Sequence, residues 1–377
     1  MDNRDRKTVL FIGPVPPPIT GQSLACEVFL GALREEYDVI LLDINKSDFA
    51  SGGFVWARVK EIAQILKRVR REAPSADMVY FTITESVLGN AKDLLIYLAC
   101  RNLLPRTVIH LHGGAGMIRL LHGPTGFLRW LNAIFLKNMA AVIVLGGRLR
   151  AVYEGLVPNE NLRVVENFAE DIYQIPPAAI DAKFSDGGPL RIFFLSNLIA
   201  EKGYLHLRDA VMEIARERPG QVLLDYAGGF VTEEEKEHFL ASIEDVPSIT
   251  YHGIVRGDEK KRLLQASHLL ALPTYYPFEG QPICILEGYA AGCGVMTTDH
   301  SGIFDIFTPG ENGWEVAKGS ADSIHAAIIE CLGNREQVAQ AARRNAGLAK
   351  DRYTARRYNN ALLAIVDEAL SRPLKRV

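Results

Sequence analysis

The sequence lacks most of the features that mark secreted, membrane-spanning and nucleic-acid-binding proteins. Its five cysteines are an odd number, lie far apart and include no Cys-x-x-Cys pair. This pattern argues against a disulfide framework or a zinc site and favours a reducing compartment. No run of about 20 apolar residues is present to span a bilayer. The start, MDNRDRKTVLFIG, is charged and then enters a short strand-like run, so it does not have the pattern of a signal peptide.

The chain also lacks an excess of charge of one sign. Lys plus Arg number 42 against 45 Asp plus Glu, a formal net charge of −3, so no general basic surface for nucleic acid is expected. With 377 residues, 48% of them hydrophobic, the chain is long enough for two domains that each bury a core.

Short β-branched and apolar runs alternate with helical segments along the whole chain. Continuous runs of this kind are typical of strands buried on both faces, and regular β-α alternation predicts parallel, Rossmann-like sheets. The expected strands are 8–12, 37–42, 79–83, 108–111, 141–145, 162–165, 191–195, 222–227, 249–253, 267–272, 294–298 and 313–316. The expected helices are 23–33, 57–72, 93–103 (a buried helix), 127–139, 204–217, 233–243, 258–265, 320–332, 335–350 and 354–370.

The periodicity is interrupted once, over residues 168–189, where Pro, Asp and Gly gather. We therefore expect an N-terminal Rossmann-like domain over 1–170, a linker over 171–189 and a second Rossmann-like domain over 190–353. A C-terminal helix, about 354–377, is expected to pack back on the first domain.

One stretch, 271–302, organises the rest of the chain. Glu279 and Glu287 stand eight apart in ALPTYYPFEGQPICILEGYAAGCGVMTTDHSG, between two expected strands. Pro282 is placed to begin a helix and Gly292 to end it, so Glu279 belongs to a loop and Glu287 to the helix.

The start of that helix is expected to bind an anion. The N–H groups of Ile283 and Cys284 have no intrahelical acceptor and carry the positive end of the helix dipole. A phosphate would suit this position, and the two carboxylates beside it would suit hydroxyl groups. A sugar nucleotide has both, although two glutamates at this spacing also occur by chance in many chains.

Two features of the first half point toward a ligand. The loop GPVPPPITGQS, 13–23, follows the first strand, and its Gly21 permits close backbone approach, although a proline-stiffened turn explains the residues equally well. His110 and His112 lie on one side of the fourth strand, and His112 comes directly before Gly113 and Gly114. We expect His112 to face a ligand, a structural histidine being the alternative.

These motifs, in this order, resemble the retaining glycosyltransferases of family four, which have the GT-B fold of two Rossmann-like domains facing each other across a cleft. The resemblance covers nearly the whole chain. The segments that carry it are GPVPPPITGQS, HLHGG, VENFAED, SNLIAEKGYLHLRDA, YHGIVRGDEKKRLLQASHLLALP, FEGQPICILEGYAAG and TTDHSGIFDIFTPGENGW.

The resemblance implies a role for each site residue. Glu287 would accept hydrogen bonds from the donor ribose, Glu279 would lie near the transferred sugar, and Lys202 would neutralise the diphosphate. His112 would contact the sugar, and the amides of the Gly21 loop would reach the phosphates. The remaining donor-binding positions implied are Gln22, Asn197, Gly280, Gln281, Pro282 and Ile283. Two positions depart from the family pattern: Asn197 replaces a residue that is usually basic, and Phe168 replaces a common hinge glycine.

The expected function is therefore retaining transfer of a sugar from a UDP- or GDP-sugar to a saccharide or lipid-linked saccharide, as in bacterial surface polysaccharide or glycoconjugate assembly. No Asp-x-Asp motif is placed to bind a metal, so no metal or other cofactor is expected. The rival functions are a sugar-nucleotide epimerase of similar fold and a non-catalytic sugar-nucleotide-binding protein.

Two helices suggest where such an enzyme would work. The segment 57–72 carries basic side chains (Arg58, Lys60, Lys67, Arg68, Arg70 and Arg71), and 127–139 is strongly apolar. A solvated charged face and a helix covering the sheet explain them equally well. An anionic membrane surface is the other partner they fit, which would place the protein in the cytoplasm, peripheral on the inner face of the cytoplasmic membrane.

Overall fold

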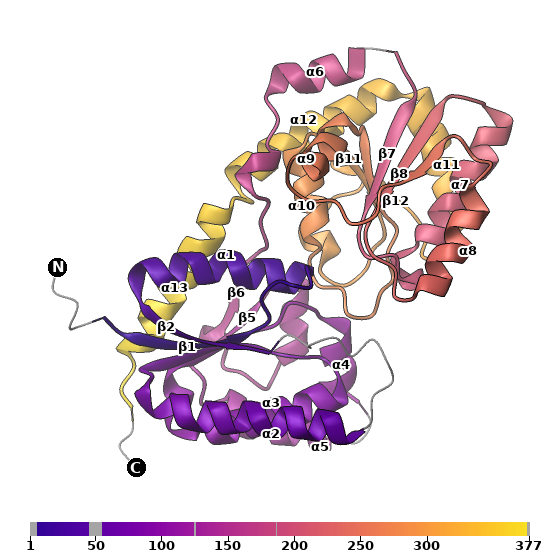
Figure 1. The fold of residues 1–377 in the computed structure, drawn as a ribbon. Coiled ribbons are helices and arrows are strands. Elements are labelled where there is room, and N and C mark those ends of the chain that lie inside the picture. The colour runs from indigo at the N-terminus through magenta and orange to yellow at the C-terminus, as the bar shows by residue number, and fades with distance from the viewer. Residues whose placement is uncertain (1–5, 45–54, 124–125, 186, 375–377) are drawn as a thin grey trace. The chain divides into compact units, whose positions relative to one another are not determined.

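The computed structural model describes residues 6–44, 55–123, 126–185 and 187–374, and the side chains of 55–58, Arg58 included, lie outside what is described. The chain forms two compact units: unit 1 comprises 1–166 with 356–377, and unit 2 comprises 167–355 (Figure 1). Among the described residues, no helix combines the length and the apolar character needed to cross a membrane.

Unit 1 is a parallel six-stranded sheet with strand order β2-β1-β3-β4-β5-β6. Helices cover both faces, with α1 and α13 on one and α2, α3 and α5 on the other (Figure 1). Its strands are β1 Thr8–Gly13, β2 Asp38–Asp43, β3 Met78–Thr82, β4 Thr107–His110, β5 Ala141–Val144 and β6 Leu162–Val164. Its helices are α1 Gly21–Glu36, α2 Val55–Glu72, α3 Val87–Ala99, α4 Ala115–Leu121, α5 Phe127–Leu136 and α13 Ala355–Ser371.

Unit 2 repeats this plan with strand order β12-β11-β10-β7-β8-β9, again all parallel. Its strands are β7 Leu190–Leu195, β8 Val222–Ala227, β9 Ile249–Tyr251, β10 Leu269–Leu272, β11 Gly294–Thr297 and β12 Gly313–Glu315. Its helices are α6 Pro177–Ser185, α7 Tyr204–Glu217, α8 Glu233–Ile243, α9 Gly257–Ala266, α10 Ile283–Ala290, α11 Ala321–Gly333 and α12 Arg335–Asp351.

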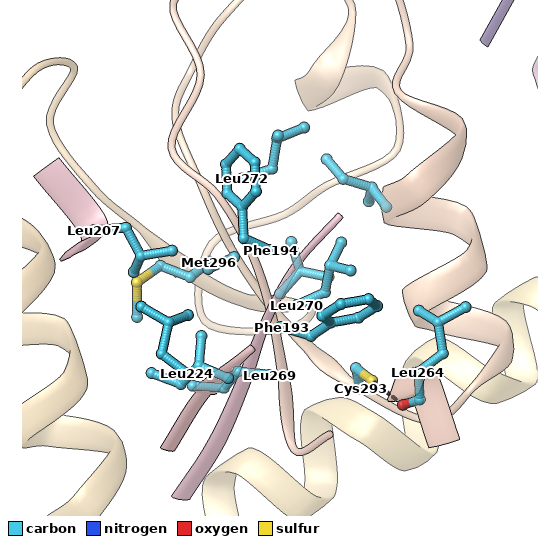
Figure 2. Close-up of a cluster of buried hydrophobic side chains, with 14 of the residues drawn as sticks. Phe193, Phe194, Leu207, Leu224, Leu264, Leu269, Leu270, Leu272, Cys293 and Met296 are labelled. Atoms are coloured by element: carbon cyan, nitrogen blue, oxygen red, sulfur yellow. Dashed lines mark hydrogen bonds between the residues drawn. The ribbon is translucent and has the colours of Figure 1, made fainter. Parts of the chain in front are cut away.

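The core of unit 2 explains why its strands are continuous apolar runs. Successive strand residues point to opposite faces, and both Phe193 and Phe194 of β7 are fully buried because helices cover each face (Figure 2). Leu207 of α7 and Leu264 of α9 complete the packing from the two sides.

The strand order of each sheet determines which loops lie next to each other at its carboxyl edge. In unit 2 the chain leaves β7 toward β8 on one side, and β10 returns to pair with β7 on the other. The loops after β7 and β10 therefore leave neighbouring strands at the carboxyl edge, where open parallel sheets bind ligands. In unit 1 the corresponding reversal lies between β1 and β3, so the loop after β1 has the equivalent position.

All twelve expected strands are present, which confirms two Rossmann-like α/β domains, but the predicted helix 93–103 and the predicted linker 171–189 differ from the structure. The helix expected at 93–103 begins at Val87, because the Ser86 side chain caps the N–H of Gly89 at 3.1 Å, and its outer face is exposed rather than buried. The stretch 171–189, which was expected to be a linker between the domains, contains helix α6 and belongs to unit 2. Helix α4, Ala115–Leu121, was not predicted.

Candidate active site

Two loops at the carboxyl edge of unit 2 are held against each other. The loop after β7 ends in a short 3₁₀ turn, Ala200–Lys202, and the backbone N–H of Tyr275, after β10, donates to Glu201 O at 2.7 Å. Gly203 makes the close approach possible: its φ is +81°, and a Cβ there would lie 2.3 Å from the Pro273 carbonyl oxygen. These contacts place Lys202 beside the loop that carries Glu279, 77 residues further along the chain.

The first pair of charges is Lys202 and Glu279. Lys202 Nζ lies 2.5 Å from Glu279 Oε2, and the two side chains are only 12% and 9% exposed. The Thr274 hydroxyl donates to the same oxygen at 3.1 Å, and Lys202 Nζ also lies 4.9 Å from the centre of the Tyr276 ring. A buried carboxylate is thus paired and hydrogen-bonded at the position where the sequence predicted a ligand-facing glutamate.

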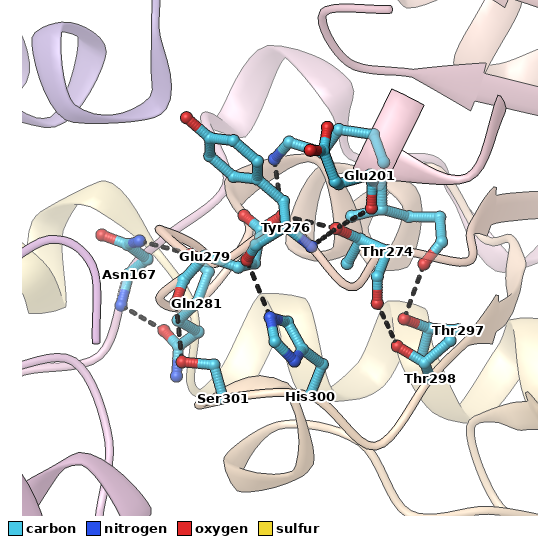
Figure 3. A network of polar contacts seen from close by, with 12 residues as sticks. Asn167, Glu201, Thr274, Tyr276, Glu279, Gln281, Thr297, Thr298, His300 and Ser301 are labelled. Carbon is cyan, nitrogen blue, oxygen red and sulfur yellow. Dashed lines mark hydrogen bonds and ion pairs between the residues drawn. The ribbon is translucent and has the colours of Figure 1, made fainter. Parts of the chain in front are cut away.

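The Glu279 loop is fixed from below by the segment after β11 (Figure 3). His300 donates from Nε2 to Tyr276 O at 2.7 Å, and the Ser301 hydroxyl donates to Glu279 O at 2.6 Å. Burial lowers the pKa of His300 below its usual value. Ser301 has a φ of +51°, the strained region for a residue with a side chain, and among the described non-glycine residues no other has a positive φ.

The second pair of charges is Glu287 and Lys260. Glu287 lies inside α10 and is 2% exposed, and Lys260 Nζ of α9 lies 2.6 Å from its Oε1. The ammonium also lies 4.7 Å from the centre of the Tyr173 ring. Sequence reasoning missed Lys260, although a glutamate on a helix with apolar neighbours signals that a cation must face it.

Helix α10 begins and ends where the sequence predicted. Pro282 is its N-cap, and Gly292 follows it with a φ of +64°. Just before it, Gln281 is clamped to Asn167, whose N–H donates to Gln281 Oε1 at 2.6 Å and whose amide donates to Gln281 O at 2.7 Å (Figure 3). The oxygens of Gln281 therefore hold the loop in place.

Cys284, in the first turn of α10, links the two pairs. Burial raises the pKa of its thiol to about 12, with Glu279 and Glu287 raising it further and Lys202 and Lys260 opposing them. All four charged side chains therefore lie close enough to Cys284 to change the pKa of its thiol. The structure brings Lys202, Glu279, Gly280, Gln281, Pro282, Ile283 and Glu287 together around the start of one helix.

Asn197 follows β7 and is exposed. Its loop packs tightly on the loop after β8: Gly228 has a φ of +150°, and a Cβ there would lie 1.8 Å from Ser196 O. Within the described ranges, one group with metal-ligand spacing is Glu213, Glu217 and His325, which lies on α7 and α11 and contains none of the predicted site residues.

In unit 1, Gly21 and Gln22 form the first turn of α1. The N-cap Thr20 and Ser23 exchange hydrogen bonds in a capping box, which fixes where the helix begins. Gly21 is exposed, and nothing lies within 4 Å of where its Cβ would be. The space beside Gly21 is therefore open, while the N–H of Ser23 in the same turn is bonded to the Thr20 hydroxyl at 3.1 Å.

His112 lies two residues beyond β4 and is half-buried. Its ring lies 4.0 Å from that of His110, centre to centre, and burial lowers the pKa of His112 to about 3. His110 shares a 2.7 Å hydrogen bond between Nδ1 and the Tyr80 hydroxyl, and among the described residues Nε2 of His110 and Nε2 of His112 are both buried without a hydrogen-bond partner. His112 therefore has an unsatisfied ring nitrogen that a polar ligand group could engage.

Comparison with known proteins identifies the class. Residues 189–334, which contain both charge pairs, match the model of the family described as Glycosyl transferases group 1. The chain as a whole has the GT-B fold: it superposes on Anabaena Alr3699/HepE in complex with UDP-glucose with a TM-score of 0.71 at 18% identity, covering 96% of this chain and 99% of that one. WaaG, a glycosyltransferase involved in lipopolysaccharide biosynthesis, gives a TM-score of 0.68 at 14% identity over 95% and 99% of the two chains.

A curated relative matches part of the chain. The amylovoran biosynthesis glycosyltransferase AmsK of Erwinia amylovora is 25% identical over 161 residues. That match spans 41% of this chain and 39% of AmsK, so only about two fifths of the length of AmsK is matched.

Proposed function

We propose that the protein is a retaining glycosyltransferase that transfers a sugar from a UDP- or GDP-sugar to a saccharide or lipid-linked saccharide. The observation that carries the proposal is the buried Lys202–Glu279 pair beside the start of α10, with Glu287 one turn further in. The family match over the same residues and the likeness to AmsK support a role in surface polysaccharide or glycoconjugate assembly.

Within unit 2, each side chain has one task in this proposal. Lys202 and the first N–H groups of α10 neutralise the diphosphate as its negative charge develops. Glu279 hydrogen-bonds the transferred sugar, and Glu287 accepts hydrogen bonds from the ribose hydroxyls. Gly280, Gln281, Pro282 and Ile283 set the course of the backbone past the sugar and β-phosphate.

Within unit 1, Gly21 and Gln22 present backbone N–H groups to a phosphate, and His112 contacts the sugar. The low pKa of His112, about 3, keeps its ring neutral, so it donates or accepts one hydrogen bond and does not act as a cation. Asn197 contributes a neutral contact where a basic residue would add charge, which leaves Lys202 as the main cation for the donor.

The proposed reaction proceeds on one face of the sugar. The acceptor hydroxyl oxygen attacks the anomeric carbon, the bond from that carbon to the β-phosphate oxygen breaks, and the acceptor proton passes to the leaving phosphate. Lys202 and backbone N–H donors stabilise the negative charge of the leaving diphosphate, so the proposed reaction needs no metal ion. Product stereochemistry by NMR tests retention, since an inverted anomeric centre would contradict it, and activity unchanged by EDTA tests metal independence.

The donor is tested by thermal shift against UDP-, GDP- and ADP-sugars. A nucleotide sugar at about 100 times its dissociation constant should stabilise the protein by about 2.7 kcal/mol. Glu287→Ala should abolish the shift, whereas Glu234→Ala, an exposed glutamate of α8, serves as the matched control and should retain it. A stabilising donor should then be transferred to an acceptor or slowly hydrolysed; epimerised donor, or binding without reaction, would contradict the proposal.

The proposed place of action is the cytoplasm, peripheral on the inner face of the cytoplasmic membrane, where a lipid-linked acceptor is exposed. The exposed basic side chains of α2 and the exposed aromatic residues of α5 support this location. Fractionation of cells expressing the protein tests it, and recovery entirely in the soluble fraction at low salt would contradict membrane contact.

A further inference from the structure

The solvent-facing side of helix α3 is apolar. Its exposed residues are Val87, Leu88, Ala91, Leu95 and Leu98, with Val87 and Leu88 62% and 66% exposed and Leu95 and Leu98 44% and 46%. At about 100° per residue all five fall within an arc of about 100°. The solvent side of this helix is therefore apolar along its whole length.

The charged residues of α3 are turned inward instead. Asp93 is fully buried and lies on the side of the helix opposite Leu95, where it accepts from the N–H and the hydroxyl of Thr84, both at 2.8 Å. Lys92 is 9% exposed and lies 3.5 Å from Asp93. The buried residues of α3 are thus both polar (Asn90, Lys92 and Asp93) and apolar (Ile96 and Tyr97), and its most exposed residues are apolar.

Helix α5 extends the apolar surface. Phe127 and Trp130 are each 59% exposed with their rings stacked, 6.2 Å between centres, and Ile134 is 38% exposed. The two helices are held together by a buried amide pair: Asn90 and Asn132 donate to each other's side-chain oxygens at 3.1 and 2.9 Å. The exposed apolar residues of α3 and α5 therefore lie on two helices in direct contact, and we call them together the α3–α5 face.

The exposed charges around the α3–α5 face are mainly basic, although Glu61 and Glu72 of α2 are half-buried and Glu154 is exposed beside Arg129 of α5. Helix α2 packs on α3 along its other side (Figure 1) and exposes Lys60, Lys67, Arg68, Arg70 and Arg71. Exposed Lys137 follows α5, which contains no acidic residue, and the single acid of α3 is the buried Asp93.

From this surface we infer that the α3–α5 face inserts into the headgroup and acyl boundary of an anionic lipid surface, with α3 as the inserting element. Exposed apolar side chains flanked by Lys and Arg, with a tryptophan among them, match what such an interface binds. A second copy fits less well, because in a two-fold interface the same patch meets itself and the exposed Lys and Arg side chains would face one another.

This inference deepens the location given under the proposed function and adds α3, which the sequence does not single out. It does not depend on sugar transfer. Its test uses neither donor nor acceptor, so the failure of one proposal is distinguishable from the failure of the other.

The test is sedimentation of the full chain with vesicles. Wild-type protein should bind phosphatidylcholine vesicles containing about 30% phosphatidylglycerol and lose most of that binding at about 0.5 M NaCl. The double variant Leu88→Ser/Leu95→Ser should bind at least about tenfold more weakly because it removes two inserted side chains. Leu240→Ser, at an exposed leucine of α8 in unit 2, is the matched control and should bind like the wild type.

Two further readouts separate insertion from simple charge attraction. Lys67→Glu/Arg70→Glu should weaken binding to anionic vesicles, and Trp130 emission should shift to shorter wavelength on binding and be quenched by brominated acyl chains. Trp130→Phe should remove that signal. Circular dichroism should be unchanged in all variants because the substituted residues are exposed.

Three outcomes would overturn the inference. The first is no vesicle binding by the wild type, and the second is undiminished binding by Leu88→Ser/Leu95→Ser. The third is a wild-type dimer in sedimentation equilibrium that the same substitutions convert to monomer, because the α3–α5 face would then be covered by a second copy.

Discussion

Replacing Lys260 by methionine is expected to destabilise unit 2 by leaving the Glu287 carboxylate buried without its cation. The two groups lie 2.6 Å apart, and the side chains of Lys260 and Glu287 are 15% and 2% exposed. Coulomb's law at an effective dielectric constant of about 20 gives an attraction of roughly 6 kcal/mol at this distance, and desolvation of both ions offsets much of it. Removing one partner exposes that penalty, so the expected loss of unfolding free energy is about 3–5 kcal/mol.

The assay is urea unfolding of Lys260→Met, Glu287→Gln and the double variant, followed by the fluorescence of the buried Trp314 in unit 2. The double variant should lose less than the sum of the single losses, with a coupling of about 1–3 kcal/mol, because no charge is then left unpaired. Additive losses, or a loss of less than about 1 kcal/mol in Lys260→Met, would refute the reasoning.

The pH dependence of the same difference provides an independent check. Burial alone would lower the pKa of Lys260, but attraction to Glu287 and contact with Tyr173 outweigh it and raise the pKa. A group whose pKa is higher in the folded state contributes its full stabilisation below the unfolded value, about 10.4 for lysine, and loses it as the pH rises through the folded value. The difference between wild type and Lys260→Met should therefore be constant from about pH 7 to 9 and shrink above about pH 10.

Three further predictions concern single residues. Gly203→Ala should lower the unfolding free energy by about 2–4 kcal/mol, since its φ is +81° and the new Cβ would collide with a backbone carbonyl; an unchanged denaturation midpoint would contradict this. Cys284 should react with iodoacetamide at pH 8 far more slowly than a free cysteine, because burial raises the pKa of its thiol to about 12; rapid labelling by mass spectrometry would contradict this. Because the folded protein takes up a proton at His112 only near pH 3 and the unfolded chain near its ordinary pKa of about 6.5, stability should fall as the pH is lowered between these values, by up to about 1.4 kcal/mol per pH unit. His112→Gln should reduce that slope in urea unfolding, and identical slopes would contradict the assignment.

The strands and the start of α10 could be predicted because local residue chemistry decides them. A parallel strand buried on both faces must be apolar throughout, as Phe193 and Phe194 illustrate, so the sequence shows it directly. Pro282 and Gly292 act through their own backbone preferences and mark the two ends of the helix without reference to the rest of the fold.

The charge pairs could not be predicted because they join distant parts of the chain. Lys202 and Glu279 are 77 residues apart and Lys260 and Glu287 are 27 apart, and only the strand order places them together. The family resemblance identified Lys202, but the partner of Glu287 could be found only from the fold, in which Lys260 of α9 reaches Glu287 of α10. The orientation of α3 was missed for a related reason: an apolar helix with one Lys-Asp pair is typical of a buried helix, and only the contacts of Asp93 with Thr84 show which side faces inward.

The buried amide pair between Asn90 and Asn132 gives the last prediction, because it should fix how α3 lies against α5. Each amide donates to the other's oxygen, and both side chains are almost completely buried, so removing one leaves the other unsatisfied. Asn90→Leu alone should therefore cost about 1–3 kcal/mol in urea unfolding, whereas replacing both by leucine should recover most of that loss, since no orphaned polar group remains. If the double variant loses as much unfolding free energy as the two single variants together, the two amides do not depend on each other for stability. If it recovers stability but no longer binds vesicles, the clamp's contribution lies in aligning the two apolar stripes, because both stripes remain intact in that variant.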